Sequence, residues 1–119
     1  MDAKHANKLL REEQQRVERE LAELRSASGS DGELSNVDQH TADTGTELFE
    51  EERAQSMIER LVRELEAIDR ALKRIDDGSY GLSIESGEPI PDARLEAVPH
   101  AERTVEEQAR FEQQHRNSG

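Results

Sequence analysis

The sequence predicts an all-α protein built on a long antiparallel coiled-coil helical hairpin. Apolar residues recur at alternating steps of four and three in two separate segments, and a long polar insert lies between them. The composition agrees, because only 32% of the 119 residues are hydrophobic and 37% are charged. That is too few apolar residues for a broad two-layer core, whereas a helical hairpin needs only one narrow stripe on each helix.

The first predicted helix covers about residues 2–26. Its apolar seam has one polar position and is formed by Leu10, Gln14, Val17, Leu21 and Leu24. The other residues of this segment are mostly Arg, Glu and Gln, which are good helix formers. A cluster of serine, glycine and aspartate over residues 26–32 is expected to end the helix.

The second predicted helix covers about residues 46–77, with Thr46 as its N-cap and Gly78 as its stop signal. Its seam is stricter than the first and consists of Ala54, Ile58, Leu61, Leu65, Ile68, Leu72 and Ile75. Neither stripe is stable alone in water, so the two helices are expected to pack against each other.

In an antiparallel arrangement the residue numbers of two facing positions always add up to the same value. This rule places Leu21 opposite Leu61 and Val17 opposite Leu65. A parallel homodimer would use the same heptads but leaves the polar insert at about residues 28–45 unexplained. We therefore expect a monomer whose residues 1–77 form the hairpin and whose residues 28–45 form its tip loop. Residues 31–53 carry eight acids and one base, a net charge of −7, so this tip is acidic.

Beyond the hairpin, residues 78–115 are expected to form a small second region, and residues 116–119 a frayed tail. Weak alternation over residues 80–91 suggests a two-stranded ribbon or knuckle. The residues expected to pack in it are Tyr80, Leu82, Ile84, Ile90, Leu95 and Val98. Residues 91–99 are expected to be a connector, and a short C-terminal helix is expected over about residues 101–115.

Composition excludes several classes of function. The net charge of −12 repels nucleic acid phosphates and anionic membranes, so we expect no direct nucleic acid binding and no membrane partner. No apolar run approaches the roughly 18 residues that span a bilayer, and there is no signal peptide, so a cytoplasmic location is expected. The chain has no cysteine nucleophile, glycine-rich phosphate loop or metal-spaced histidine pair, so we expect no enzyme.

Three segments resemble the DksA/TraR family. Residues 71–81 (ALKRIDDGSYG) look like the end of its long helix and the Tyr-Gly start of its zinc finger. Residues 87–101 (GEPIPDARLEAVPHA) match its Gly-Glu-x-Ile and Arg-Leu-Glu-Ala-x-Pro-x-Ala run. Residues 38–48 (DQHTADTGTEL) are similar to the tip of the DksA-like branch of spore-forming Gram-positive bacteria, and the whole resemblance covers roughly residues 33–110.

The resemblance implies a transcription regulator that binds bacterial RNA polymerase. Family members insert the hairpin into the secondary channel of the polymerase, so that acidic tip residues approach the active site. Asp43 aligns with the essential tip aspartate, Asp38 is a candidate substitute for the second one, and Arg60 aligns with an arginine that contacts the polymerase rim. The tip also departs from the family, because His40 and Gly45 replace an aspartate and an alanine.

The zinc finger of the family is degenerate in this chain. Its four cysteine positions are occupied by Ser83, Ser86, Thr104 and Glu107, so the resemblance implies a lost zinc site. The basic positions associated with the alarmone ppGpp are Ala67, Val98 and Gln108, none of which is charged. We therefore expect neither zinc nor ppGpp as a cofactor. The alternative function is a coiled-coil adaptor or stress protein that kept the fold but binds a different protein.

Overall fold

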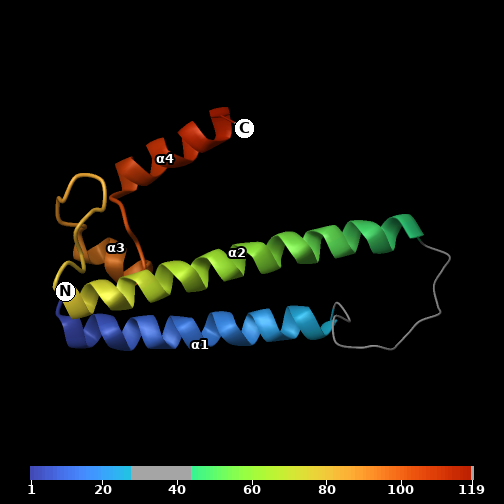
Figure 1. Cartoon of the computed structure of the whole chain (residues 1–119), viewed down its shortest axis with the longest axis horizontal. Coiled ribbons are helices and arrows are strands. Elements are labelled where there is room, and N and C mark those ends of the chain that lie inside the picture. The colour runs from blue at the N-terminus through green and yellow to red at the C-terminus, as the bar shows by residue number, and fades with distance from the viewer. Residues whose placement is uncertain (28–43, 119) are drawn as a thin grey trace. The chain divides into compact units, whose positions relative to one another are not determined.

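A computed structural model describes residues 1–27 and 44–118 of the chain (Figure 1). These residues form four helices: α1 (Ala3–Ala27), α2 (Thr44–Asp77), α3 (Asp92–Ala97) and α4 (Val105–Ser118). Within these ranges there is no strand, and one isolated antiparallel bridge joins Leu82 to Pro89. The predicted all-α class is confirmed, and residues 80–91 form a knuckle rather than a ribbon.

The chain divides into two compact units. The first unit consists of Met1–Glu13 and Ala67–Gly119, and the second unit consists of Gln14–Glu66. Both long helices therefore contribute one segment to each unit. The domain boundaries expected after residues 77 and 115 stay predictions.

In the second unit the end of α1 and the beginning of α2 run antiparallel, side by side (Figure 1). Val17, Leu21 and Leu61 are buried, as their seam positions predict. The Arg16 guanidinium lies 3.6 Å from the Glu64 carboxylate and joins the two helices. This ion pair is compatible with a register that places Val17 near Leu65.

The helix segments of the first unit bury Ala6, Leu10, Ile68 and Ala71 completely. Leu10 and Ile68 are predicted seam residues, whereas the two alanines lie outside the predicted seams. An α-helix drifts relative to a strict seven-residue repeat, so the buried stripe reaches Ala71 beside Leu72, which is half-buried.

The ends of α2 have clear local causes. Gly78 adopts a left-handed conformation with φ of 85°, which glycine reaches without strain. Its N–H donates to Ile75 O at 3.3 Å, and the N–H of Ser79 donates to Arg74 O at 2.9 Å. This is the bonding pattern of a Schellman motif, so Gly78 ends the helix as predicted. At the other end the helix begins at Thr44, two residues before the expected Thr46.

A small apolar cluster lies beyond α2 in the first unit. Ile90, Leu95 and Ala101 are buried in it, and the partly buried Met1, Tyr80 and Val98 pack against them. The segment expected to be a connector contains α3, which buries Leu95. The Tyr80 hydroxyl donates to Pro99 O at 2.8 Å, which satisfies the polar end of the ring.

The knuckle differs from the expected packing. Leu82 is 41% exposed and Ile84 is 50% exposed, although both were expected inside. Ser83 between them is buried instead. The segment therefore turns a hydroxyl, and not its two aliphatic side chains, toward the interior, because this hydroxyl has a charged hydrogen-bond partner there.

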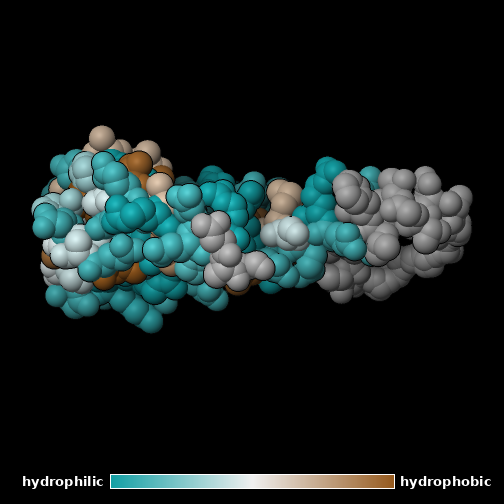
Figure 2. Space-filling model, turned by 90° about the horizontal axis from the view of Figure 1, so that it is seen from above, coloured by the Kyte–Doolittle hydropathy of each residue, from teal (hydrophilic) through white to brown (hydrophobic). Residues whose placement is uncertain are grey.

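Most of the surface visible in Figure 2 is hydrophilic, and the largest hydrophobic patches lie over the first unit. This agrees with the high charge content of the sequence. Among the described residues, no helix combines the length and apolar character needed to cross a bilayer.

Candidate functional site: the finger and the exposed face of α2

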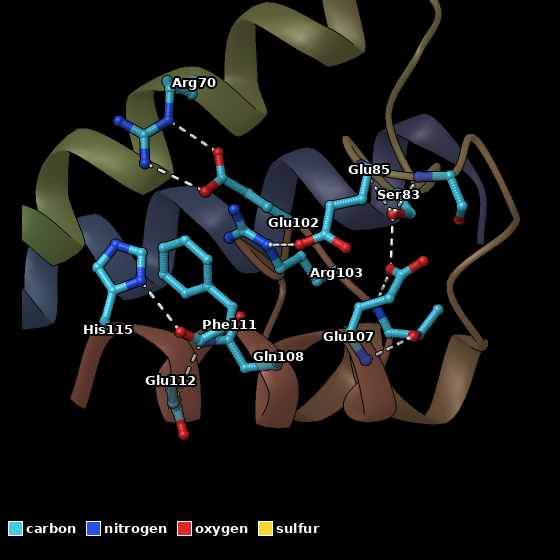
Figure 3. A network of polar contacts seen from close by, with 12 residues as sticks. Arg70, Ser83, Glu85, Glu102, Arg103, Glu107, Gln108, Phe111, Glu112 and His115 are labelled. Atoms are coloured by element: carbon cyan, nitrogen blue, oxygen red, sulfur yellow. Dashed lines mark hydrogen bonds and ion pairs between the residues drawn. The ribbon is translucent and has the colours of Figure 1, made fainter. Parts of the chain in front are cut away.

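The four positions that carry cysteine in the resembling family come together in the first unit. Ser83 and Glu107 are both buried, with exposed fractions of 4% and 7%. The Ser83 hydroxyl donates to Glu107 Oε1 at 2.6 Å, a short charge-assisted hydrogen bond (Figure 3). This bond joins the knuckle, which is the turn segment of residues 79–91, to α4, and the two residues are 24 positions apart in the sequence.

The same carboxylate caps α4. Thr104 N donates to Glu107 Oε1 at 2.9 Å, and Glu107 N donates to Thr104 Oγ1 at 3.2 Å. This reciprocal pair is a capping box, in which a threonine before the helix and a glutamate three residues later satisfy each other's backbone. It explains why α4 begins at Val105 and not near Ala101, where its start was expected.

Ser83 also organises the turn that follows it. Its Oγ accepts hydrogen bonds from Glu85 N at 3.0 Å and Ser86 N at 3.2 Å, while its own N–H donates to Glu88 O at 2.8 Å. Gly87, with φ of 76°, supplies the left-handed residue of this turn. One serine therefore holds the knuckle turn and connects it to α4.

The electrostatics of Glu107 follow from these contacts. Hydrogen bonds from the Ser83 and Ser86 hydroxyls and from the Thr104 backbone lower the pKa of Glu107 to about 2, against the smaller opposing effect of burial. Hydrogen bonds to the charged form of a carboxylate favour that form. Glu107 is therefore ionised at neutral pH although it is buried.

These residues do not fit zinc. Structural zinc sites use thiolate and imidazole ligands, whereas three of the four positions here hold neutral hydroxyls. The hydroxyls of Ser83 and Thr104 are already engaged in hydrogen bonds with protein groups. Within residues 1–27 and 44–118, no group of three or more His, Asp or Glu side chains is arranged to hold a metal ion.

A second polar network connects α2 to the segment that precedes α4. Arg70 Nε and Nη2 donate to the two oxygens of Glu102 at 2.7 and 3.1 Å (Figure 3). Arg74 Nη1 donates to the same carboxylate at 3.3 Å. Burial raises the pKa of Glu102, but the two arginines outweigh it and the net shift is downward.

Arg103 extends this network to the knuckle and to α4. Its Nε donates to Glu85 Oε2 at 2.7 Å, and its Cζ lies 3.7 Å from the centroid of the Phe111 ring. The Phe111 ring in turn lies 4.0 Å from the His115 ring, centroid to centroid. The apolar contacts of this helix are limited, because Val105 and Ala109 are exposed.

The candidate polymerase contact, Arg60, is exposed on the part of α2 that belongs to the second unit. Arg53 and Arg63, which are also exposed, lie seven residues before it and three residues after it. These spacings put the three arginines on one helix face, away from the seam of Ile58, Leu61 and Leu65. The structure thus gives Arg60 an accessible position on the helix face that also carries Arg53 and Arg63.

The two candidate tip residues, Asp43 and Asp38, lie outside the described residues, and so does His40. Their roles stay predictions. The three positions linked to ppGpp in the family are described, and all three (Ala67, Val98 and Gln108) are half-buried and uncharged.

Glu107 has a role that the sequence analysis missed. In the family pattern Glu107 is only the residue at the fourth cysteine position, although the spacing Thr104-Val105-Glu106-Glu107 is the sequence signature of a capping box. That signature was sufficient to predict both the start of α4 and an ordered carboxylate at this position.

Comparison with known proteins places this geometry in a family. A family model described as the prokaryotic dksA/traR C4-type zinc finger matches residues 78–113. The structure of transcription factor DksA2 from Pseudomonas aeruginosa superposes with a TM-score of 0.76 at 26% sequence identity, covering 96% of this chain and 85% of that one.

Two relatives are similar over most of the chain. General stress protein 16O of Bacillus subtilis is 44% identical over 101 residues, which cover 83% of this chain and 61% of that protein. The RNA polymerase-binding transcription factor DksA of Caulobacter vibrioides is 37% identical over 108 residues, which cover 91% of this chain and 68% of that protein. With this identity over this share of both sequences, the chain belongs to the DksA/TraR family.

Proposed function

We propose that this chain is a DksA-like transcription regulator that binds bacterial RNA polymerase. The observation that carries the proposal is the 37% identity, over 91% of the chain, to a protein named as an RNA polymerase-binding transcription factor. In this proposal the chain acts in the cytoplasm as a monomer, performs no catalysis, and contacts the polymerase rather than DNA. The net charge of −12 supports the last point.

Binding is assigned to the exposed arginine face of α2. Arg60 and Arg63 are accessible there, and guanidinium groups suit carboxylates on a partner surface because they offer paired N–H donors. In a chain of net charge −12, a local group of arginines favours an acidic patch on the polymerase and orients the approach of the two proteins.

The effect on transcription is assigned to the tip. In this proposal the hairpin enters the secondary channel and brings Asp43, with Asp38 as a second carboxylate, near the catalytic Mg²⁺. An extra carboxylate there alters the occupancy of the metal or the fit of the incoming nucleotide, because Mg²⁺ prefers oxygen ligands.

The binding half of the proposal is tested with purified bacterial RNA polymerase core. Arg60→Ala is expected to weaken the affinity about tenfold, which corresponds to about 1.4 kcal/mol. Arg19→Ala, which removes an exposed arginine from α1 in the same unit, is the matched control and is expected to bind like the wild type. Equal effects of the two substitutions would contradict the assignment of the binding face to α2.

The tip half is tested in a purified transcription initiation assay. Asp43→Asn is expected to keep polymerase affinity within a factor of two to three while removing most of the effect on initiation. Asp76→Asn, at an exposed aspartate of α2, is the control for the loss of one negative charge. An unchanged effect of Asp43→Asn on initiation would contradict the role of the tip.

An adaptor that binds another protein is the second candidate. The observation that favours it is the replacement of all four family cysteine positions, together with the 44% identity to a protein named only as a general stress protein. Absence of measurable binding to polymerase core, in an assay where a DksA protein binds, would favour this alternative.

A further inference from the structure

The finger of this chain has two parts that must be joined. One is the knuckle of residues 79–91, and the other is the segment of residues 102–107 that leads into α4. In a C4-type finger, four thiolates on one metal ion make this joint. The residues at the corresponding positions here do not fit zinc, so a different joint is needed.

Hydrogen bonds from the knuckle reach three residues on the α4 side, Glu102, Arg103 and Glu107. Ile84 N donates to Glu102 O at 2.9 Å, Arg103 Nε donates to Glu85 Oε2 at 2.7 Å, and Ser83 Oγ donates to Glu107 Oε1 at 2.6 Å. In the last of these both side chains are buried. A hydrogen bond to a charge is stronger where water is excluded, so the Ser83–Glu107 bond is the central one.

Glu107 Oε1 accepts two hydrogen bonds from opposite sides of the joint. One comes from the Ser83 hydroxyl in the knuckle, and the other comes from Thr104 N at the start of α4. A single carboxylate oxygen therefore fixes the turn and the helix start at the same point. Ser83 extends this hold, because its Oγ also accepts hydrogen bonds from Glu85 N and Ser86 N.

We propose that the Glu107 carboxylate takes the structural place of the metal ion in this finger, holding the knuckle to α4 through Ser83, so that the finger folds without zinc. The proposal concerns the fold of the finger and does not depend on the identity of the partner. The low pKa of Glu107 supports it, because the carboxylate keeps the charge that strengthens both bonds.

The first experiment tests whether Glu107 connects the knuckle to α4 or only caps the first turn of α4. Backbone amide exchange is measured on the full chain for the wild type, Glu107→Ala and Glu106→Ala. Glu106 is an exposed acid in the same first turn, so its substitution matches the change in charge near the helix N-terminus. Glu107→Ala is expected to speed exchange at the Glu85 and Ser86 amides at least tenfold, and Glu106→Ala is expected to leave them unchanged.

If faster exchange in Glu107→Ala is confined to the first turn of α4, Glu107 is only a cap and the proposal is wrong. A thermodynamic cycle adds a second readout on folded variants. Ser83→Ala and Glu107→Ala are each expected to lower the Tm by about 5 °C, and the double variant is expected to lower it by clearly less than the sum. Additive losses would overturn the proposal.

The metal is tested directly on the wild-type chain. Addition of EDTA and of Zn²⁺ are each expected to leave the Tm and the exchange of the Glu85 and Ser86 amides unchanged. Elemental analysis after dialysis is expected to find no stoichiometric zinc. One zinc per chain, with loss of amide protection upon chelation, would show that a metal ion makes the joint.

Discussion

Arg70 binds both carboxylate oxygens of Glu102 with two parallel hydrogen bonds of 2.7 and 3.1 Å. Glu102 is separated from Arg70 by 32 residues, so this pair fixes a long-range contact between α2 and the segment before α4. Arg74 binds the same carboxylate, which makes Glu102 the acceptor for two cations.

Glu102→Ala is expected to destabilise the chain by about 1–2 kcal/mol, because it removes a bidentate ion pair and leaves the half-buried Arg74 without this acceptor. Urea denaturation followed by circular dichroism measures the loss. Glu88→Ala, at an exposed acid of the knuckle, is the control and is expected to change stability by less than about 0.5 kcal/mol. A loss no larger than that of the control would mean that the pair contributes nothing.

The pH dependence of stability depends on Glu107. Its pKa is about 2 in the folded chain, below its ordinary value of 4.5, so the unfolded state binds its proton first as the pH falls. The stability that this carboxylate contributes is present above about pH 4.5 and is lost as the pH falls toward 2. Glu107→Gln is therefore expected to flatten the decline of unfolding free energy between pH 4.5 and 2.

Urea denaturation at several pH values in that window measures the slope. Glu102 and Asp77, whose pKa values are also lowered, remain in both chains and cancel in the comparison. Glu106→Gln should retain the wild-type slope. If Glu107→Gln retained it as well, Glu107 would not be ionised by its hydrogen bonds in the way described.

The two leucines in the middle of the second-unit seam are expected to differ. Leu61 is buried, so Leu61→Ala is expected to cost about 2–4 kcal/mol through lost burial and the cavity it leaves. Leu65 is only half-buried, so Leu65→Ala is expected to cost about 1–2 kcal/mol. Chemical denaturation measures both, with Gln55→Ala as the exposed control, and a larger loss for Leu65 than for Leu61 would contradict the burial described.

Four cysteines are expected to restore a zinc site. The combined variant Ser83→Cys, Ser86→Cys, Thr104→Cys and Glu107→Cys is expected to bind one zinc per chain and to lose stability upon chelation, because these positions already meet around Glu107. In the control, Glu106→Cys replaces Glu107→Cys, which moves one thiolate to an exposed position. Elemental analysis measures the zinc content of both variants. Equal zinc content would contradict the convergence of the four positions in the folded chain.

The hairpin could be predicted from sequence because its signal is periodic and local. Leu10, Val17, Leu21, Leu61 and Ile68 are buried where the heptads place them. Ala6 and Ala71 were missed, since alanine carries little hydrophobic signal and the strict heptad ignores helix drift. The helix stop at Gly78 was predictable, because only glycine adopts its left-handed conformation without strain.

The knuckle could not be predicted in the same way. Its alternation suggested that Leu82 and Ile84 point inward, whereas the buried residue is Ser83. The free energy of burying that hydroxyl depends on a carboxylate 24 residues away, which no local pattern reveals. The start of α4 was a different kind of miss, because the capping box between Thr104 and Glu107 is visible in the sequence.

The Ser83–Glu107 joint also affects how the finger responds to oxidants. A finger held by thiolates releases its metal when peroxide converts the sulfur atoms to sulfenic acid or disulfide. This chain has two methionines and no cysteine, and the atoms that make the hydrogen bonds between the knuckle and α4 are oxygen and nitrogen. Peroxide therefore finds no thiolate sulfur at the Ser83–Glu107 contact that holds the finger together.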